Sequence, residues 1–403
     1  MQKDYHLPVS RAEFITLMAM MFASIAFSID AMLSVLPDIA RDLDLADPGR
    51  SPLILMIFMA GLGLGTFVTG PVSDAFGRRK TLMAGAVIYA IGAAIAMSAQ
   101  SFEVMLVARF IQGFGAAGPR VVSLAVVRDV FAGREMARVM SFVILVFLVF
   151  PALAPAFGNA IAIAAGWRAI FAAFLIFIVI LSVWYLSRIP ETLQEEHRRP
   201  LRIGLMWDAV KEMFAHPTVR LSIAVQTLML AILFTLLTMI QPIFEVSFDR
   251  ADSFPYWFGA IALGSGISSF INASLVLRFG MRRLITWALY AQILISFVCL
   301  AAIWPLGPDM FWVFVVWQLT VMFQAGMTVA NLNAIAMEPM GHIAGMAASV
   351  IGAVSTIVAA GLAAPMGFLF DGTPRPLMII VLGYALLAAI LMQFMRFSDR
   401  KTS

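Results

Sequence analysis

The sequence has few charged residues and almost no cysteine. Charged side chains make up 12% of its 403 residues, and the one cysteine, Cys299, lies inside an apolar run. Soluble proteins carry about 25% charged residues, and a lone cysteine cannot form an intrachain disulfide. A water-soluble enzyme, a disordered chain and a disulfide scaffold are therefore all disfavoured.

Signatures of catalysis and metal binding are also missing. The four histidines, His6, His197, His216 and His342, are scattered along the chain and match no metal-ligand spacing. The sequence contains no nucleophile elbow and no phosphate-cradling loop. We therefore expect a protein that is not an enzyme and that needs no cofactor.

Apolar residues are present in excess. They make up 62% of the chain, against about 45–50% in an average protein, and the mean hydropathy is +0.94. A soluble fold of this size has too little interior to bury so much apolar surface. The composition predicts an all-α membrane protein that contacts the lipid bilayer. Its net charge of +4 comes from short basic clusters between apolar runs, a pattern that sets membrane orientation and predicts no nucleic-acid partner.

Twelve apolar runs are long enough to span a membrane, since a bilayer core of about 30 Å needs about 20 helical residues. They lie at residues 14–37, 52–73, 80–99, 103–127, 138–161, 168–187, 219–243, 255–277, 284–304, 311–335, 345–367 and 376–396. The first run is too long for the core of a signal peptide, and we interpret it as a retained span. One set of alternate connections, with the termini, carries 20 Lys and Arg residues and the other set carries five, which predicts that both termini are cytoplasmic.

The chain contains an internal repeat. A shift of 203 residues superimposes seven residues of the second and eighth runs and of the basic turns that follow them. The matched pairs are Pro52 and Pro255, Gly61 and Gly264, Gly63 and Gly266, Phe76 and Phe279, Gly77 and Gly280, Arg79 and Arg282, and Lys80 and Arg283. The repeat predicts two pseudo-symmetric six-helix bundles, residues 1–187 and 218–403, joined by a cytoplasmic central loop at 188–217, as in secondary transporters.

The segment "GPVSDAFGRRK" follows the second run. Gly70 and Gly77 permit a close backbone approach and a tight turn, and Asp74 can accept a hydrogen bond from Arg78 on the short loop. Such a charged turn can latch a helix bundle in one position. The alternative is that Arg78 and Arg79 only anchor the topology.

Two ionisable residues are predicted to lie at similar depth in the membrane. Asp30 in the first run and Arg109 in the fourth are each about 10 Å below the outer surface by helix rise. Because charged groups are costly in hydrocarbon, such residues usually face a cavity or a partner. Asp30 and Arg109 are therefore candidates for proton coupling, with a static structural ion pair as the alternative.

Arg120 follows Arg109 by eleven residues, so both project from nearly the same helix face. Its permanent charge suits it to anchor anionic or acceptor groups, and a structural bond to backbone carbonyls is an equal alternative. The amides Gln226 and Asn331 either line a substrate cavity or bond between helices.

The fifth run contains "PALAPAFG", in which Pro151 and Pro155 stand four residues apart and Gly158 follows. Proline bends a helix and glycine lets a neighbour pack closely. This pattern predicts a kinked gating helix, with a passive packing kink as the alternative. The segment at 363–367, "AAPMG", is its expected equivalent in the eleventh run.

On these residues the chain resembles the major facilitator superfamily. More narrowly, it is similar to twelve-span bacterial drug:proton antiporters of the bicyclomycin and chloramphenicol resistance (Bcr/CflA) branch. The matching segments are "SIDAMLSVLPDIA", "GPVSDAFGRRK", "RFIQGFGAAG", "VVRDVF", "PALAPAFG", "GWRAIF" and "ANLNAIAMEPMGHIAG".

The resemblance implies a bacterial inner-membrane protein, expected as a monomer, that exports drugs in exchange for protons by alternating access. It assigns Gln112 to the same motif as Arg109, near the expected substrate cavity. Two positions depart from the family pattern: Ala75 replaces the arginine after the loop acid, and Thr66 replaces a glutamine.

Two other functions stay open from the sequence. The first is an importer, or a dedicated exporter of one metabolite, in which Arg120 binds an anionic group. The second is a membrane sensor or scaffold that transports nothing, for which the 30-residue middle segment offers little binding surface.

Overall fold

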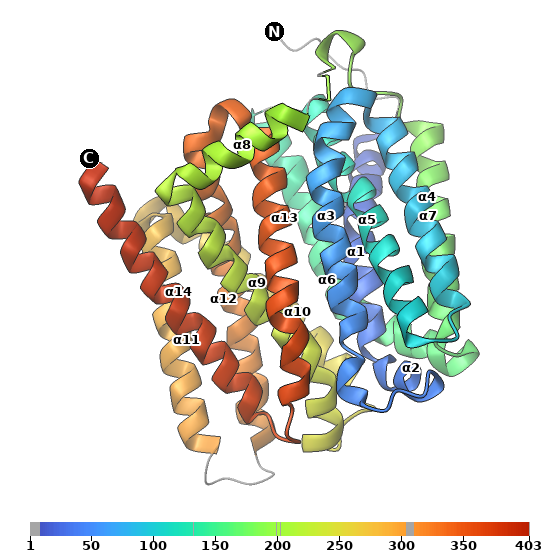
Figure 1. The fold of residues 1–403 in the computed structure, drawn as a ribbon, viewed down its shortest axis with the longest axis vertical. Coiled ribbons are helices and arrows are strands. Elements are labelled where there is room, and N and C mark those ends of the chain that lie inside the picture. Colours follow the sequence, from blue (N-terminus) through green and yellow to red (C-terminus); the bar gives the residue numbers. More distant parts are fainter. Residues whose placement is uncertain (1–8, 132, 199, 202, 304–309, 403) are drawn as a thin grey trace. The chain divides into compact units, whose positions relative to one another are not determined.

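The computed structural model describes residues 9–131, 133–198, 200–201, 203–303 and 310–402, and within them the chain is helical (Figure 1). Twelve long helices coincide with the twelve predicted runs. They are α1 (Arg11–Leu33), α3 (Leu53–Phe76), α4 (Arg78–Met97), α5 (Phe102–Val130), α6 (Gly133–Ala165), α7 (Arg168–Arg188), α9 (Pro217–Pro242), α10 (Phe254–Phe279), α11 (Met281–Ile303), α12 (Phe311–Met337), α13 (Ala344–Ala363) and α14 (Arg375–Thr402). The predicted all-α membrane fold is therefore confirmed.

Length and hydropathy alone mark ten helical stretches of the described residues as able to cross a membrane. One of them, Phe311–Leu369, contains both α12 and α13. In α6 the stretch found among the described residues, Val149–Ala165, is slightly shorter than the others. These two cases account for the difference between ten stretches and twelve spanning helices.

The chain forms two compact units. The first comprises residues 1–45 and 57–203, and the second comprises 46–56 and 204–403. The boundaries predicted from the sequence, 187/188 and 217/218, stay a prediction.

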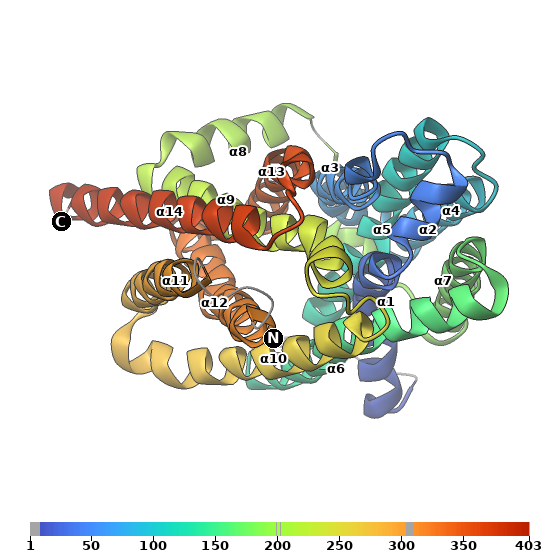
Figure 2. The same ribbon diagram turned by 90° about the horizontal axis from the view of Figure 1, so that it is seen from below.

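Corresponding helices pack together in both units. In the first unit α1 packs against α5, α6 and α7, and α4 packs against α5 and α7. In the second unit α9 packs against α12, α13 and α14, and α11 packs against α12 and α14. Figure 2 shows α11 nearly end-on and α14 extending across the view within the second unit. Each pair of the first unit has its counterpart six spans later, as expected from a duplicated bundle.

The turns after the second and eighth spans share a backbone conformation. Gly77 and Gly280, which are 203 residues apart, have φ angles of 98° and 79°. Side-chain-bearing residues rarely adopt such angles. The glycine repeat in the sequence therefore marks the same sharp turn in both units.

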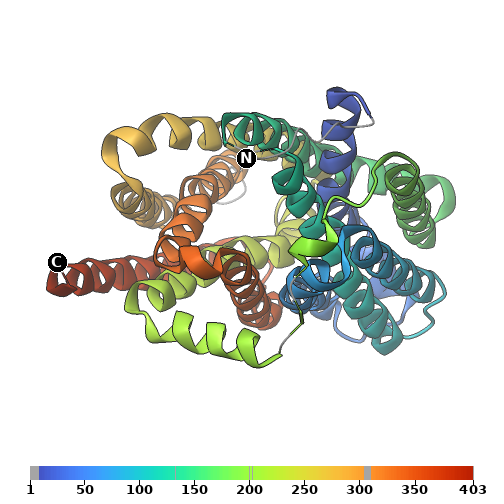
Figure 3. The same ribbon diagram turned by 90° about the horizontal axis from the view of Figure 1, so that it is seen from above.

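Three features differ from the sequence-based expectation. The first span ends at Leu33 rather than Pro37, and a separate helix, α2 (Leu36–Asp42), follows it with Pro37 in its first turn, where proline is tolerated. The middle segment is not only a loop, because it contains the helix α8 (Ile203–Ala215). Figure 3 shows that α8 lies across the direction of the long helices of its own unit.

The third difference concerns the predicted equivalence of the two proline segments. Pro151 and Pro155 both lie inside the continuous helix α6. By contrast, α13 ends at Ala363, and Pro365 stands in the first turn of a 3-10 helix, η6 (Ala364–Leu369). Because proline lacks the N–H that would continue the α-helix, the eleventh span changes its helix type at this point.

Candidate functional site

Asp30 lies near the C-terminal end of α1 and is 6% exposed. Among the residues that the structure describes, none donates a hydrogen bond to its carboxylate or forms an ion pair with it. It lies three residues before the end of α1 at Leu33, in a largely apolar part of that helix. A buried carboxylate without a partner is costly, and such residues in membranes are commonly functional.

The helix α6 holds the backbone of α1 beside Asp30. A Cβ atom on Gly158 would overlap the carbonyl oxygen of Ala31. One turn away, the Ser34 hydroxyl donates to the carbonyl oxygen of Pro155 at 3.1 Å. Gly158 and Pro155, which the sequence predicted as part of a gating helix, therefore pack directly against the segment that carries Asp30. Pro151 is half-buried one turn earlier on α6.

Arg109 is fully buried on α5 and makes several polar contacts. Its guanidinium donates to Gln112 Oε1 at 2.7 Å and to the carbonyl oxygen of Ser28 at 3.0 Å. It also lies over the ring of Phe58, 4.3 Å from the centroid. Within the described residues, no ion pair joins Arg109 to Asp30. The two residues are at similar depth, as predicted, but Arg109 binds the backbone two residues before Asp30 instead of its carboxylate.

Ser28 joins three helices at the level of Arg109. Its hydroxyl lies 2.5 Å from the phenol oxygen of Tyr89, a buried residue of α4. Its carbonyl oxygen accepts the hydrogen bond from Arg109 on α5. Nothing in the sequence singles out Ser28 or Tyr89, because their relationship depends on how α1, α4 and α5 pack.

Arg120 is half-buried and faces α1, as Arg109 does. Its guanidinium lies 5.8 Å from the centroid of the Phe22 ring. Among the described residues, none accepts a hydrogen bond from this guanidinium and no carboxylate pairs with it. The alternative of a bond to backbone carbonyls is therefore not seen in this structure.

The two predicted amides of the second unit, Asn331 and Gln226, lie on different helices. The Asn331 amide on α12 donates to Asn272 Oδ1 on α10 at 2.7 Å and to the carbonyl oxygen of Met327 at 2.9 Å. Gln226 on α9 is buried, and its Oε1 has no partner within the described part of the chain. Of the two predicted cavity residues, Asn331 thus makes an interhelical bond and Gln226 keeps an unused acceptor.

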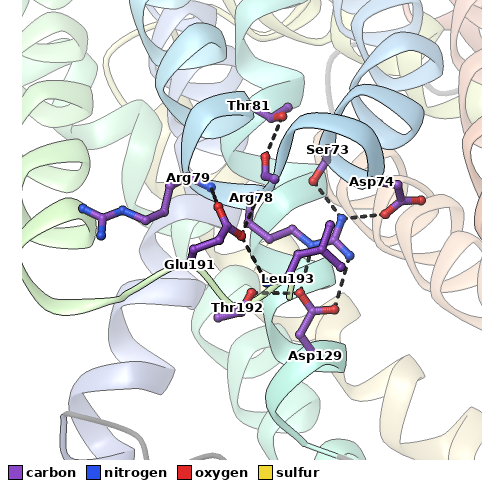
Figure 4. Close-up of polar contacts among 10 residues, drawn as sticks. Ser73, Asp74, Arg78, Arg79, Thr81, Asp129, Glu191, Thr192 and Leu193 are labelled. Atoms are coloured by element: carbon purple, nitrogen blue, oxygen red, sulfur yellow. Dashed lines mark hydrogen bonds and ion pairs between the residues drawn. The ribbon is translucent and has the colours of Figure 1, made fainter. Parts of the chain in front are cut away.

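The turn between α3 and α4 is a dense polar cluster (Figure 4). Arg78 donates to Asp74 Oδ1 at 2.6 Å, to Ser73 Oγ at 2.9 Å, and to Asp129 Oδ2 and Oδ1 at 2.8 and 3.2 Å. The bond between Asp74 and Arg78 is the one that the sequence suggested. Asp129, at the C-terminus of α5, accepts hydrogen bonds from Arg78 with both carboxylate oxygens. This bidentate arrangement is the one that best fits a guanidinium. Gly70 lies half-buried within α3, seven residues before Gly77.

Glu191 connects the segment after α7 to the start of α4. Its carboxylate accepts hydrogen bonds from the backbone N–H groups of Arg78 and Arg79 at 2.9 and 3.0 Å. Gly77 precedes these residues and has no side chain to cap the helix, so Glu191 performs the capping that an N-cap residue usually provides. The neighbouring Thr192 hydroxyl donates to Asp129 at 2.8 Å.

The cluster of Figure 4 thus contains two acids that sequence reasoning did not assign. Asp129 belongs to "VVRDVF" and Glu191 to "PETLQEE". Each is an acid at the predicted cytoplasmic end of a span, on the same side as the basic turn. An acid at a span end on the same side as the basic turn is a candidate partner for its arginines, and this pattern could have identified both residues.

Comparison with known proteins gives the same fold and a family. Residues 16–364 match the family described as Major Facilitator Superfamily. The bicyclomycin resistance protein homolog of Haemophilus influenzae is 28% identical over 367 residues, 91% of each chain. The multidrug resistance protein MdtL of Vibrio parahaemolyticus is 27% identical over 379 residues, also 91% of each chain.

A solved structure agrees at the level of the fold. The crystal structure of a D-xylose–proton symporter superimposes with a TM-score of 0.75 at 16% sequence identity, covering 95% of this chain and 97% of the other. The family match spans most of the chain and both of its units. The chain therefore belongs to the major facilitator superfamily and is a multi-pass secondary transporter, not an enzyme.

Proposed function

We propose that this transporter exports small, fairly apolar drug-like compounds of the phenicol or bicyclomycin type in exchange for protons. Transport occurs across the bacterial inner membrane by alternating access, with both termini in the cytoplasm. The relatives named for bicyclomycin and multidrug resistance support this proposal, as do the antiporter-like proline and glycine residues of α6.

The observation that carries the proposal is the isolation of Asp30. It is a buried carboxylate without a partner among the described residues, and it lies beside the close contact of α1 with Gly158. A carboxylate in this position can bind a proton in one conformation and release it in the other. One proton moving across 100 mV supplies about 2.3 kcal/mol, which is sufficient for more than tenfold accumulation of a neutral compound.

The other predicted residues have supporting roles in this proposal. Arg109 fixes the backbone next to Asp30 and tunes its charge, with Gln112 as its hydrogen-bond partner. The cluster around Arg78 latches the cytoplasmic side of the first unit. Arg120, Gln226 and Asn331 provide polar contacts for the cargo.

Transport by reconstituted protein tests the proposal. In proteoliposomes with an imposed pH gradient, the Asp30→Asn variant is expected to bind chloramphenicol and to lose proton-driven transport, whereas Asp30→Glu retains part of it. Asp38→Asn, which removes an exposed carboxylate of α2, serves as the matched control and is expected to behave as the wild type. Undiminished proton-driven transport by Asp30→Asn would refute the role of Asp30.

A resistance panel tests the class of cargo independently. Expression in an efflux-deficient host is expected to raise resistance to phenicol-type compounds, and a protonophore is expected to abolish the effect. Uptake of a compound down the same proton gradient would instead favour the importer.

A further inference from the structure

The two deep arginines of α5 differ in how their charges are balanced. Arg109 is held by an amide oxygen, a backbone carbonyl and the face of Phe58. Arg120 has only the ring of Phe22, and no hydrogen-bond acceptor among the described residues. An arginine is always charged, and an uncompensated charge within a membrane is costly.

Among the residues that the structure describes, no carboxylate forms an ion pair with Arg120. Asp30 lies in the last turn of α1. Arg109 is level with Ser28, and the eleven residues from Arg109 to Arg120 span about 16 Å. Asp30 is thus roughly 20 Å away along the helix axis.

Two acids near the opposite ends of α1 and α5 from Asp30 and Arg109 are already engaged. Asp129 pairs with Arg78, and Glu13 pairs with Arg188. No described acid therefore supplies a countercharge to Arg120, which leaves its guanidinium available to an anionic ligand.

We propose that Arg120 and Phe22 form a binding site for the negatively charged group of an aromatic monoanion, and that such anions are cargo of this transporter. One guanidinium matches one carboxylate through two parallel hydrogen bonds, and the neighbouring ring offers an aromatic surface to the rest of the molecule. This inference rests on the proposed function, because it names a class of exported compound.

The membrane potential favours this cargo. An anion leaves a negatively charged cytoplasm down the potential, and 100 mV corresponds to a concentration ratio of about 50 for one charge. The distance between Asp30 and Arg120 separates the proton site from the anion site. Exchange between them then depends on the conformational change of the transporter and not on direct competition for one group.

Binding to the purified full-length protein tests the proposal. In nanodiscs of phosphatidylethanolamine and phosphatidylglycerol, isothermal titration compares salicylate with salicylamide, its uncharged analogue of nearly the same shape. We expect wild type to bind salicylate about 10- to 100-fold more tightly, the range given by one charged hydrogen-bonded contact. Arg120→Gln is expected to lose this preference and still bind salicylamide, whereas Arg120→Lys retains part of the preference.

Controls separate this site from general electrostatics and from proton coupling. Lys211→Gln removes one exposed positive charge on α8 and is expected to leave the preference unchanged. An equal affinity of wild type for both compounds, no salicylate binding, or a preference that persists in Arg120→Gln would each overturn the proposal. Salicylate binding with the expected dependence on Arg120, together with proton-driven transport that survives in Asp30→Asn, would refute the proton-coupling role and leave the anion site standing.

Discussion

Gly158 of α6 packs against the carbonyl oxygen of Ala31, the residue that follows Asp30. Helix α1 and helix α6 approach so closely at this point that the α6 residue has room for a hydrogen atom only. The position of the membrane-embedded carboxylate is therefore set by backbone contact as well as by side chains. Any movement of α6 relative to α1 changes the surroundings of Asp30 directly.

Adding one methyl group at this contact should separate the two helices. We expect Gly158→Ala to lower the free energy of unfolding by about 1–3 kcal/mol, the usual cost of overpacking, and to impair transport. Denaturation in detergent micelles and transport in proteoliposomes measure the two effects. Gly361→Ala on α13 is the matched control, since no atom lies within 4 Å of a Cβ there; equal effects of both substitutions would contradict the packing argument.

The stability of the protein is expected to depend on the planar guanidinium of Arg109 as well as on its charge. Lysine at this position keeps the charge but cannot donate at once to Gln112 and to the Ser28 carbonyl in the same geometry. Leaving one buried acceptor without its donor costs about 1–3 kcal/mol. Arg109→Lys should therefore be destabilised by that amount in thermal or chemical unfolding, and a wild-type unfolding curve would show that the fork is dispensable.

The two carboxylates that bind Arg78 should contribute unequally. The Asp129 side chain is 17% exposed and the Asp74 side chain is 43% exposed, and water weakens an ion pair. Asp129→Asn is expected to cost about 1.5–3 kcal/mol, whereas Asp74→Asn should cost less than about 1 kcal/mol. Unfolding of both variants in the same detergent gives the comparison, and a larger loss for Asp74→Asn would reverse this ranking.

The amide pair of the second unit can be tested with a double-mutant cycle. Asn272→Leu and Asn331→Leu each leave one buried amide without its partner, while the double variant removes both. Hydrogen bonds of this kind within membranes contribute about 0.6 kcal/mol on average. We expect the double variant to be less destabilised than the sum of the single variants by about that amount, and strict additivity would indicate that the two amides act independently.

The sequence predicted the spans because hydrocarbon imposes a length and a composition on any helix that crosses it. It also predicted the contact of Asp74 with Arg78, which are one helical turn apart, and the similar depth of Asp30 and Arg109. These features depend on local geometry. Gly77 and Gly280 could likewise be matched from the sequence, because each sharp turn requires a glycine.

The partners that the sequence did not reveal all come from other helices. The Ser28 carbonyl oxygen accepts a hydrogen bond from Arg109, which is 81 residues away in the sequence. The Glu191 carboxylate accepts one from the backbone of Arg78, 113 residues away. Such contacts depend on how neighbouring helices are rotated, and apolar periodicity in a helix that is apolar on every side does not determine that rotation. The same limit explains why the sequence left open whether Asn331 lines a cavity or bonds between helices, and the structure shows its bond to Asn272.

Glu191 also has a consequence for how the protein is made. The start of α4 is capped by a residue that the ribosome adds only after three further spans have been synthesised. Until then, the backbone N–H groups of Arg78 and Arg79 lack this acceptor. Only the side-chain bonds of Arg78, such as those to Asp74 and Asp129, then hold the turn. The first unit is thus completed by its own trailing segment, and a nascent chain released before that segment emerges would lack the cap of α4.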